Sequence, residues 1–134
     1  MKHIVVDLEM NSIEKKHRIF GCTMETIEIG AIMPDENYHE ISSFKTYVKP
    51  EYNNKIEKNI SRLTGITNNM VVNAPKFNEV LKKFSDWCLA ADDDIRIYAW
   101  SKNDYKQIAK EIRLKRYDIR PEESMVYLIY RHLL

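Results

Sequence analysis

The chain has 134 residues, which suits one domain with a buried core. Its composition, 44% hydrophobic and 31% charged, is that of an ordinary globular protein and excludes disordered and fibrous classes. The formal net charge of +1 creates no global field toward nucleic acid or membrane. No apolar run is long enough to span a membrane and no signal peptide precedes the first strand, so we expect no membrane partner and a cytoplasmic location.

The first half of the chain predicts three strands. Residues 3–9 form an apolar run that reads as a central strand covered on both faces, and residues 10–24 are polar and read as a loop. Residues 26–33 predict a second strand, which a turn at 34–37 connects to a third strand over 39–49. Short connections between three strands favour an antiparallel meander.

The hydrophobic period then becomes helical. Ile56, Ile60 and Leu63 share a helical face that ends at Gly65. A clear amphipathic helix follows Pro75; its apolar positions are Phe77, Val80, Leu81, Phe84, Trp87 and Cys88.

Residues 95–100 predict a fourth strand, and Ser101 can cap a helix over 102–115. After Pro121, the spacing of Met125, Leu128, Ile129 and His132 favours one more helix. A fifth strand over 126–130 is the alternative that this short apolar run leaves open.

This order of elements predicts an α/β domain that spans residues 1–134, with a mixed sheet and helices packed on it. The segment between the third and fourth strands is long enough for a helical crossover. Such a crossover makes the fourth strand parallel to the first.

Two acids, Asp7 and Glu9, end the first strand and point to the same face because side chains alternate along a strand. Solvated acids at a strand end are the simplest interpretation of such a pattern. The surrounding run of Ile4, Val5, Val6 and Leu8 argues against it, since a covered strand is a costly place for two like charges. A divalent cation between the carboxylates would offset that cost.

Asp104 follows the fourth strand and belongs to the first turn of the predicted helix. By itself it reads as a helix cap, because Ser101-x-x-Asp104 resembles a capping box. If the first and fourth strands are parallel neighbours, Asp104 lies close to Asp7 and Glu9. Three converging carboxylates select hard cations such as Mg²⁺ or Mn²⁺.

A basic excess covers residues 102–120. Its positive side chains are Lys102, Lys106, Lys110, Arg113, Lys115, Arg116 and Arg120. These charges can meet phosphates or can simply form a solvated helix face, and spacing does not separate the two interpretations.

Taken together, the motifs resemble the DEDD-type 3′–5′ exonucleases, the superfamily of proofreading domains and oligoribonuclease. The matching segments occur in order through most of the chain: 4–10, 25–32, 44–50, 60–67, 74–81 and 98–104. The resemblance implies an RNase H-like fold and a 3′–5′ exonuclease that hydrolyses single-stranded RNA or DNA to nucleoside 5′-monophosphates. It is similar to the stand-alone exonuclease domains of bacteria.

The resemblance also implies roles for individual residues. Asp7, Glu9 and Asp104 would be catalytic and would hold two Mg²⁺ or Mn²⁺ ions. The 3′ end of the nucleic acid would be contacted by Met10, Asn11, Trp100 and Ser101.

The third motif of the family, a general-base His or Tyr with a fourth carboxylate on a late helix, has no match here. His132 is the only late histidine, and we expect it to have no catalytic role. The sequence therefore predicts a domain that is C-terminally truncated, lacks the last helices and has weak activity or none. Without the last helices, apolar surface of the sheet would be exposed. Such a surface favours a homodimer through the exposed or swapped C-terminal segment.

Two other functions stay open. In one, the domain is a regulatory module that binds nucleic acid or protein through a degenerate exonuclease site. In the other, the chain is a truncated product without a role of its own.

Overall fold

The computed structural model describes residues 1–90, 94–99 and 102–115. Its four strands form one sheet in the order β3-β2-β1-β4. The strands are β1 (Lys2–Ser12), β2 (Met24–Pro34), β3 (Glu40–Tyr47) and β4 (Ile95–Ala99). β1 pairs antiparallel with β2 and parallel with β4. This is the mixed sheet that the sequence predicts, with a βββ meander and one parallel strand.

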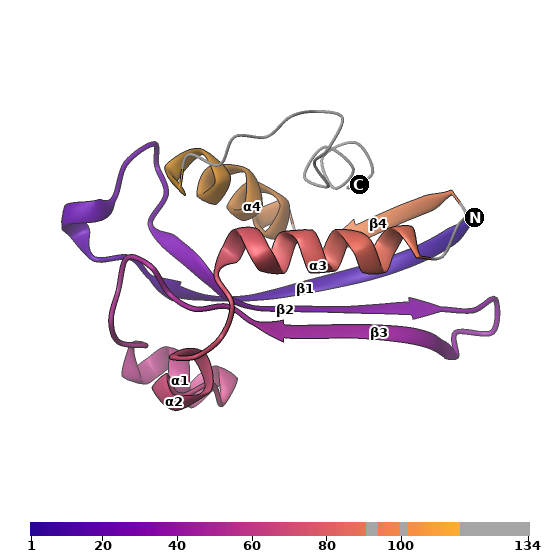
Figure 1. Ribbon diagram of the computed structural model, residues 1–134, viewed down its shortest axis with the longest axis horizontal. Coiled ribbons are helices and arrows are strands. Elements are labelled where there is room, and N and C mark those ends of the chain that lie inside the picture. The colour runs from indigo at the N-terminus through magenta and orange to yellow at the C-terminus, as the bar shows by residue number, and fades with distance from the viewer. Residues whose placement is uncertain (91–93, 100–101, 116–134) are drawn as a thin grey trace.

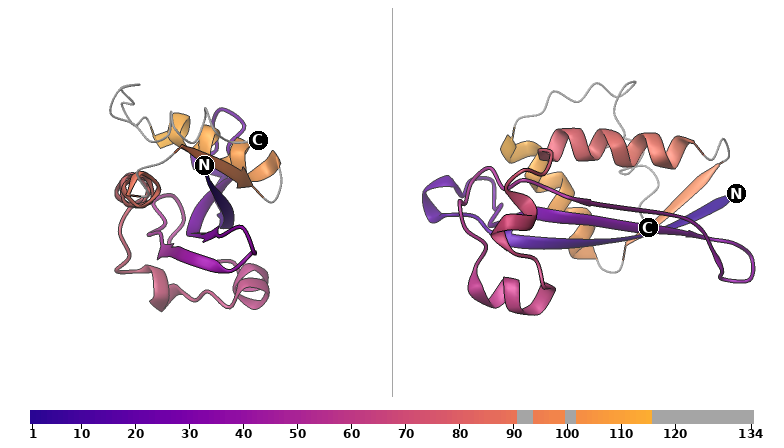
Figure 2. Two further views of the ribbon diagram at one scale, coloured as in Figure 1. Left: turned by 90° about the vertical axis from the view of Figure 1, so that its right-hand side faces the viewer. Right: turned by 60° about the horizontal axis from the view of Figure 1, so that its bottom comes forward.

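The helices are α1 (Lys58–Thr64), α2 (Asn68–Val71), α3 (Phe77–Leu89) and α4 (Lys102–Lys115), and a short 3₁₀ turn, η1, covers Lys15–His17. α3 and α4 lie on the same side of the strands, whereas α1 and α2 lie away from them, beyond the end of β3, where α1 contacts β1 (Figures 1 and 2). None of the helices in the described ranges is long and apolar enough to cross a lipid bilayer.

The main core lies between one face of the sheet and the two longer helices. Ile4, Val6 and Leu8 of β1 are each at most 4% exposed. They pack in one cluster with apolar side chains of β2, α3, β4 and α4, among them Ile29, Phe77, Phe84, Ile97 and Ile108. Burial of this apolar surface is the largest stabilising contribution to the domain.

β1 is a central strand, but the prediction that it is covered on both faces is wrong for the described residues. Asp7 is exposed and Val5 is half-buried, because α3 and α4 pack on the face of Ile4, Val6 and Leu8. The opposite face of β1 is the one that carries the two acids.

The predicted elements differ from the structure mainly at their ends. β1 and β2 continue to Ser12 and Met24 because their pairing extends through Asn11 and Glu25, which shortens the predicted loop at 10–24. Leu63 is 82% exposed, so the apolar face predicted for α1 is narrower than its spacing suggested. The short α2 was not predicted, since four residues carry no periodic signal.

Two predictions fall outside the described residues. These are the last helix or fifth strand after Pro121 and the self-association through that segment. Both stay predictions.

A buried ionic network attaches the end of α4 to β2. The Lys115 ammonium lies 2.8 Å from Glu111, 3.2 Å from Glu25 and 3.1 Å from Glu51, and its side chain is 2% exposed. Burial by itself lowers the pKa of Lys115, but the charges of Glu111 and Glu25 outweigh burial and hold that pKa above its ordinary value.

The carboxylates of this network also hold backbone. Glu111 Oε1 accepts hydrogen bonds from the Thr26 N–H at 2.8 Å, the Thr26 hydroxyl at 2.8 Å and the Gln107 amide at 2.9 Å. Glu25 accepts from the N–H groups of Glu51 and Tyr52. With Lys115 on its other oxygen, Glu111 is surrounded by donors, so we assign it as a carboxylate. The network thus joins α4, β2 and the segment after β3.

Replacing Lys115 with methionine tests this network. We expect Lys115→Met to lower the free energy of unfolding by about 3–5 kcal/mol at neutral pH, because it leaves buried carboxylates without a cation. Urea denaturation measures the loss, and Lys82→Met on the exposed side of α3 is the control.

The loss of stability in Lys115→Met should be smaller at acidic pH. Burial already raises the pKa of Glu111 above its ordinary value against the opposing charge of Lys115, and removing that charge raises it further. A carboxyl group whose pKa is higher in the folded than in the unfolded state binds its proton on folding. The variant therefore gains stability as the pH falls from neutral toward the unfolded pKa of about 4.3. A deficit that is independent of pH would contradict the assignment.

Candidate active site

Two acids project from the face of β1 that is opposite the main core. Asp7 and Glu9 alternate with the buried Val6 and Leu8, so the same burial that orients the apolar residues turns the acids away from the main core. In the sheet, Asp7 lies opposite Gly30 and Glu9 lies opposite Glu28. Asp7 is exposed and Glu9 is partly buried.

Asp104 approaches these acids from a different element. Among the described residues, β4 pairs with β1 as far as the Val6–Ala99 pair, and α4 starts three residues later. The first turn of α4 therefore lies beside the second half of β1. Asp104 belongs to this turn and is 6% exposed.

The pKa of Glu9 indicates which negative charges lie near its carboxylate. Burial raises it above its ordinary value, and the negative charges of Asp7, Glu28 and Asp104 raise it further. Acids from β1, β2 and α4 thus share one electrostatic environment. Across the described ranges, however, no three Asp, Glu, His or Cys side chains are arranged so that they could hold one metal ion.

Glu28 is a member of this environment that the sequence did not single out. It lies opposite Glu9 across the β1–β2 pair, and the Lys45 ammonium of β3 is 3.8 Å from its carboxylate. Alternation along β2 would have placed Glu28 on the face away from Ile29. Its position opposite Glu9 depended on the strand register, which sequence does not supply.

A shallow groove of about 390 Å³ adjoins Asp7 on the same face of the sheet. Its lining is mostly apolar and comes from the three antiparallel strands: Val5, Asp7, Gly30, Ala31, Ile32, Ser43, Phe44 and Lys45. Ile32 is 44% exposed there. Gly30 places no side chain opposite Asp7 in this groove.

Of the residues predicted to contact nucleic acid, two are described. Asn11 is fully buried; its amide donates to the Lys55 carbonyl at 3.0 Å and accepts from the Glu57 N–H at 2.9 Å. These bonds tie β1 to the segment that enters α1. Met10 is partly buried next to it. Trp100 and Ser101 lie outside the described residues.

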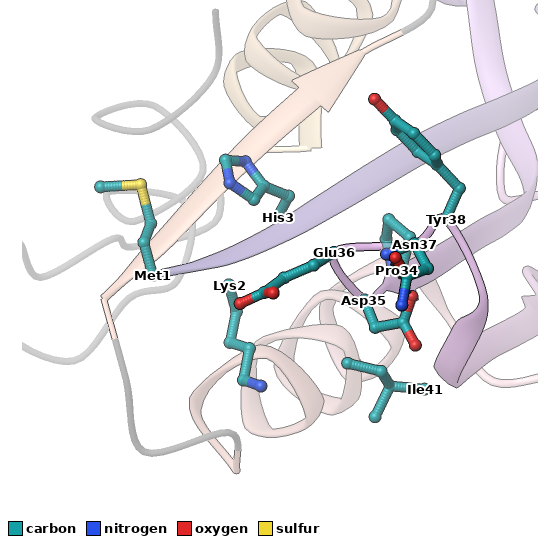
Figure 3. Close-up of a pocket in the computed structure, with 9 residues that line it drawn as sticks. All are labelled: Met1, Lys2, His3, Pro34, Asp35, Glu36, Asn37, Tyr38 and Ile41. Atoms are coloured by element: carbon teal, nitrogen blue, oxygen red, sulfur yellow. Dashed lines mark hydrogen bonds between the residues drawn. The ribbon is translucent and has the colours of Figure 1, made fainter.

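A larger hollow, of about 610 Å³, lies at the other end of the sheet, between the start of β1 and the turn that joins β2 to β3 (Figure 3). Its acid Asp35 accepts hydrogen bonds from the N–H groups of Asn37 and His39 at 2.8 and 2.9 Å. Asp35 therefore stabilises the turn. This hollow is separate from the acids of β1.

The stretch 4–129 matches the RNase_T family, whose description is exonuclease. The chain belongs to this exonuclease family. The resemblance to the DEDD-type 3′–5′ exonuclease superfamily is confirmed.

Individual relatives agree with this assignment. DNA polymerase III subunit epsilon of Buchnera aphidicola subsp. Baizongia pistaciae is 31% identical over 97 residues, which is 68% of this chain and 36% of that protein. The 3'-5' exoribonuclease 1 of Homo sapiens is 39% identical over 64 residues, 47% of this chain and 18% of that protein. The chain thus spans about a third or less of the length of these relatives.

The fold has a similar counterpart among solved structures. The nuclease domain of 3'hExo, a DEDDh family member bound to rAMP, superposes with a TM-score of 0.76 at 25% identity. The match covers 90% of this chain and 62% of that one. The RNase H-like fold that the resemblance implied is confirmed.

Replacing Glu28 with glutamine tests the shared environment. We expect Glu28→Gln to lower the pKa of Glu9 toward its ordinary value, because it removes one of the negative charges that raise it. A carboxyl ¹³C NMR titration measures this pKa directly. The control is Glu79→Gln on the exposed side of α3, which should leave it unchanged. An unchanged pKa in Glu28→Gln would show that the two acids do not interact.

Proposed function

We propose that this domain is a metal-dependent 3′–5′ exonuclease that acts on single-stranded RNA or DNA. The observation that carries the proposal is the meeting of Asp7, Glu9 and Asp104 in one electrostatic environment, in a chain of the exonuclease family. The names of its relatives, an exoribonuclease and a polymerase subunit, support a nucleic-acid substrate.

The donor set suits divalent cations. It consists of carboxylate oxygens that repel one another: burial raises the pKa of Glu9, and the negative charges of Asp7, Glu28 and Asp104 raise it further. In the proposal, Asp7, Glu9 and Asp104 hold two Mg²⁺ or Mn²⁺ ions. When bound, such ions supply Lewis-acid stabilisation of the phosphate and lower the pKa of a nearby water.

The protein residues then position the reacting bond. In the proposal, the terminal phosphodiester lies close to Asp7 on β1 and to Asp104 on α4. A water oxygen forms a bond to phosphorus, the bond from phosphorus to the 3′ oxygen breaks, and that oxygen takes up a proton. The products are a nucleoside 5′-monophosphate and a strand with a new 3′ hydroxyl.

Met10, Asn11, Trp100 and Ser101 are proposed to surround the terminal nucleotide. For Asn11 the contribution is that of a positioning residue, because its amide is already bonded to the backbone of Lys55 and Glu57. Those bonds fix the end of β1 relative to the segment before α1. A terminal nucleotide would meet the backbone around Asn11 rather than its amide.

The rate should be low. A positioned general base typically contributes about 10²–10⁴-fold to a hydrolysis, and the sequence contains no match to the family motif that supplies one. We therefore propose slow hydrolysis as the property of this 134-residue chain.

A second candidate is a regulatory module that binds nucleic acid or protein without cleaving it. It is favoured by one observation: within the described parts of the chain, no three acids are arranged to hold a metal ion. The two candidates differ in whether metal-dependent release of nucleotides occurs at all.

The deciding experiment measures Mn²⁺-dependent shortening of a 5′-labelled single-stranded oligonucleotide. We expect stepwise loss of mononucleotides from the 3′ end, and Asp7→Ala and Asp104→Ala should each lower the rate by about 10²-fold or more, since each removes a charge that binds cation. Asp86→Ala, on an exposed position of α3, is the matched control and should retain the wild-type rate.

Hydrolysis that both substitutions leave unchanged would refute the site. Binding of the oligonucleotide without any metal-dependent hydrolysis would favour the regulatory module. A block at the 3′ end, such as a terminal 3′ phosphate, should slow the reaction if it starts there.

A further inference from the structure

Exposed basic side chains follow the outer face of α4. Lys106, Lys110 and Arg113 are spaced by four and three residues, so they lie in one row along the helix, and all three are exposed. The opposite face of α4 carries the buried Asp104 and Glu111. The structure thus identifies part of the charged run as a surface that faces solvent.

The loop between β1 and β2 packs against the C-terminal part of α4. Ile13 and Cys22, from the two ends of this loop, pack with Leu114 of α4 in one buried cluster. Burial raises the pKa of the Cys22 thiol, and Lys110 is close enough to oppose that shift. The loop adds two further exposed lysines, Lys15 and Lys16.

The side chains of Phe20 and Arg113 lie against each other where the loop meets the helix. The Arg113 guanidinium lies over the Phe20 ring, 4.2 Å from its centroid, and Phe20 is 49% exposed. The backbone of Phe20 has φ of +55°, which is unfavourable for a bulky residue. Such a conformation persists only where surrounding structure imposes it, and it concentrates at functional sites.

The positive charges of this surface are poorly neutralised. In the described ranges, no carboxylate lies within ion-pair distance of Lys106, Lys110 or Arg113. Lys16 is paired only with Glu14, at 3.4 Å, and that pair is largely exposed to solvent. A partner with regularly spaced negative charges would complement the row.

We propose that this basic platform, defined as Lys106, Lys110 and Arg113 with Phe20, Lys15 and Lys16, binds single-stranded nucleic acid upstream of its 3′ end. The lysines contact phosphates and the Phe20–Arg113 pair stacks a base. The polarity rests on the proposed exonuclease function, which places the 3′ end at Asp104. Nucleic acid is favoured over an acidic protein because the surface combines cations with an aromatic face that can stack on bases.

The geometry sets a length requirement. Nine residues separate Asp104 from Arg113 along α4, a distance of about 13.5 Å at 1.5 Å per residue. A dinucleotide held at Asp104 would not reach the Phe20–Arg113 pair, whereas a strand of about 12 nucleotides would. This pair should therefore affect long substrates and leave short ones unchanged.

The test measures binding of a labelled single-stranded oligonucleotide of about 12 nucleotides by fluorescence anisotropy in EDTA, over a range of salt concentrations. We expect Lys110→Glu/Arg113→Glu to weaken binding about tenfold or more at about 50 mM salt. The slope of log affinity against log salt should fall by roughly 0.7, the value for the one phosphate contact that is lost with Lys110. Phe20→Ala should weaken binding about fivefold or more, with the slope unchanged, because it removes stacking and no charge.

Two control variants distinguish the loss of a specific contact from unfolding and from a general change in charge. Lys82→Glu/Lys83→Glu makes the same charge change on the exposed side of α3 and should leave binding unchanged. Lys106→Gln/Lys110→Gln keeps Arg113 on Phe20 and should give an intermediate loss, which provides a readout if the charge reversal unfolds the protein. Hydrolysis of a dinucleotide in Mn²⁺ should be equal in wild type, Phe20→Ala and Lys110→Glu/Arg113→Glu, since these variants leave Lys106 in place.

The outcomes distinguish the two proposals. Wild-type affinity in Lys110→Glu/Arg113→Glu, or displacement of the oligonucleotide by polyaspartate at equal concentration, would overturn the platform; the latter would assign the surface to an acidic protein. Absence of hydrolysis with platform-dependent binding intact would overturn the exonuclease proposal alone.

Discussion

The architecture depends on the parallel pairing of β1 with β4. These strands are far apart in sequence, and the crossover through α1, α2 and α3 brings them side by side. Because parallel strands end at the same edge of a sheet, the helix that follows β4 starts beside the second half of β1. This constraint alone places Asp104 in the environment of Glu9. A different strand order would leave Asp104 as an ordinary helix-cap residue.

The two ends of α4 differ in whether nearby carboxylates are compensated by a positive charge. At its C-terminal end, Lys115 offsets buried carboxylates, and hydrogen bonds satisfy their oxygens. At its N-terminal end, Asp104 is one of the acids whose negative charge, after burial, raises the pKa of Glu9. The ionic network around Lys115 holds the helix in place. The repulsion among the acids near Asp104 is unfavourable, and a bound cation would reduce it. A helix anchored at one end can hold a repelling charge at the other.

The predictable part of this protein was the part with a strong local pattern. Alternation along β1 showed that Asp7 and Glu9 share a face, and the apolar spacing of α3 predicted a helix at its observed position. The paired extension of β1 and β2 to Ser12 and Met24 escaped prediction because it is supported by a neighbouring strand rather than by hydrophobic alternation. The prediction that Leu63 belongs to a packed apolar face was wrong for a related reason. Helical spacing identifies a face but not whether anything packs against it.

The sequence by itself determined the fold class and the family and predicted the three acids, because these depend on local periodicity and on motifs in a fixed order. Only the tertiary structure decided which other groups meet them. It placed Glu28 opposite Glu9, occupied the Asn11 amide with backbone of another segment, and brought Phe20 under Arg113. These contacts join residues from different elements, and their formation depends on strand register and helix packing. Neither quantity is encoded in the spacing of residues along a single element.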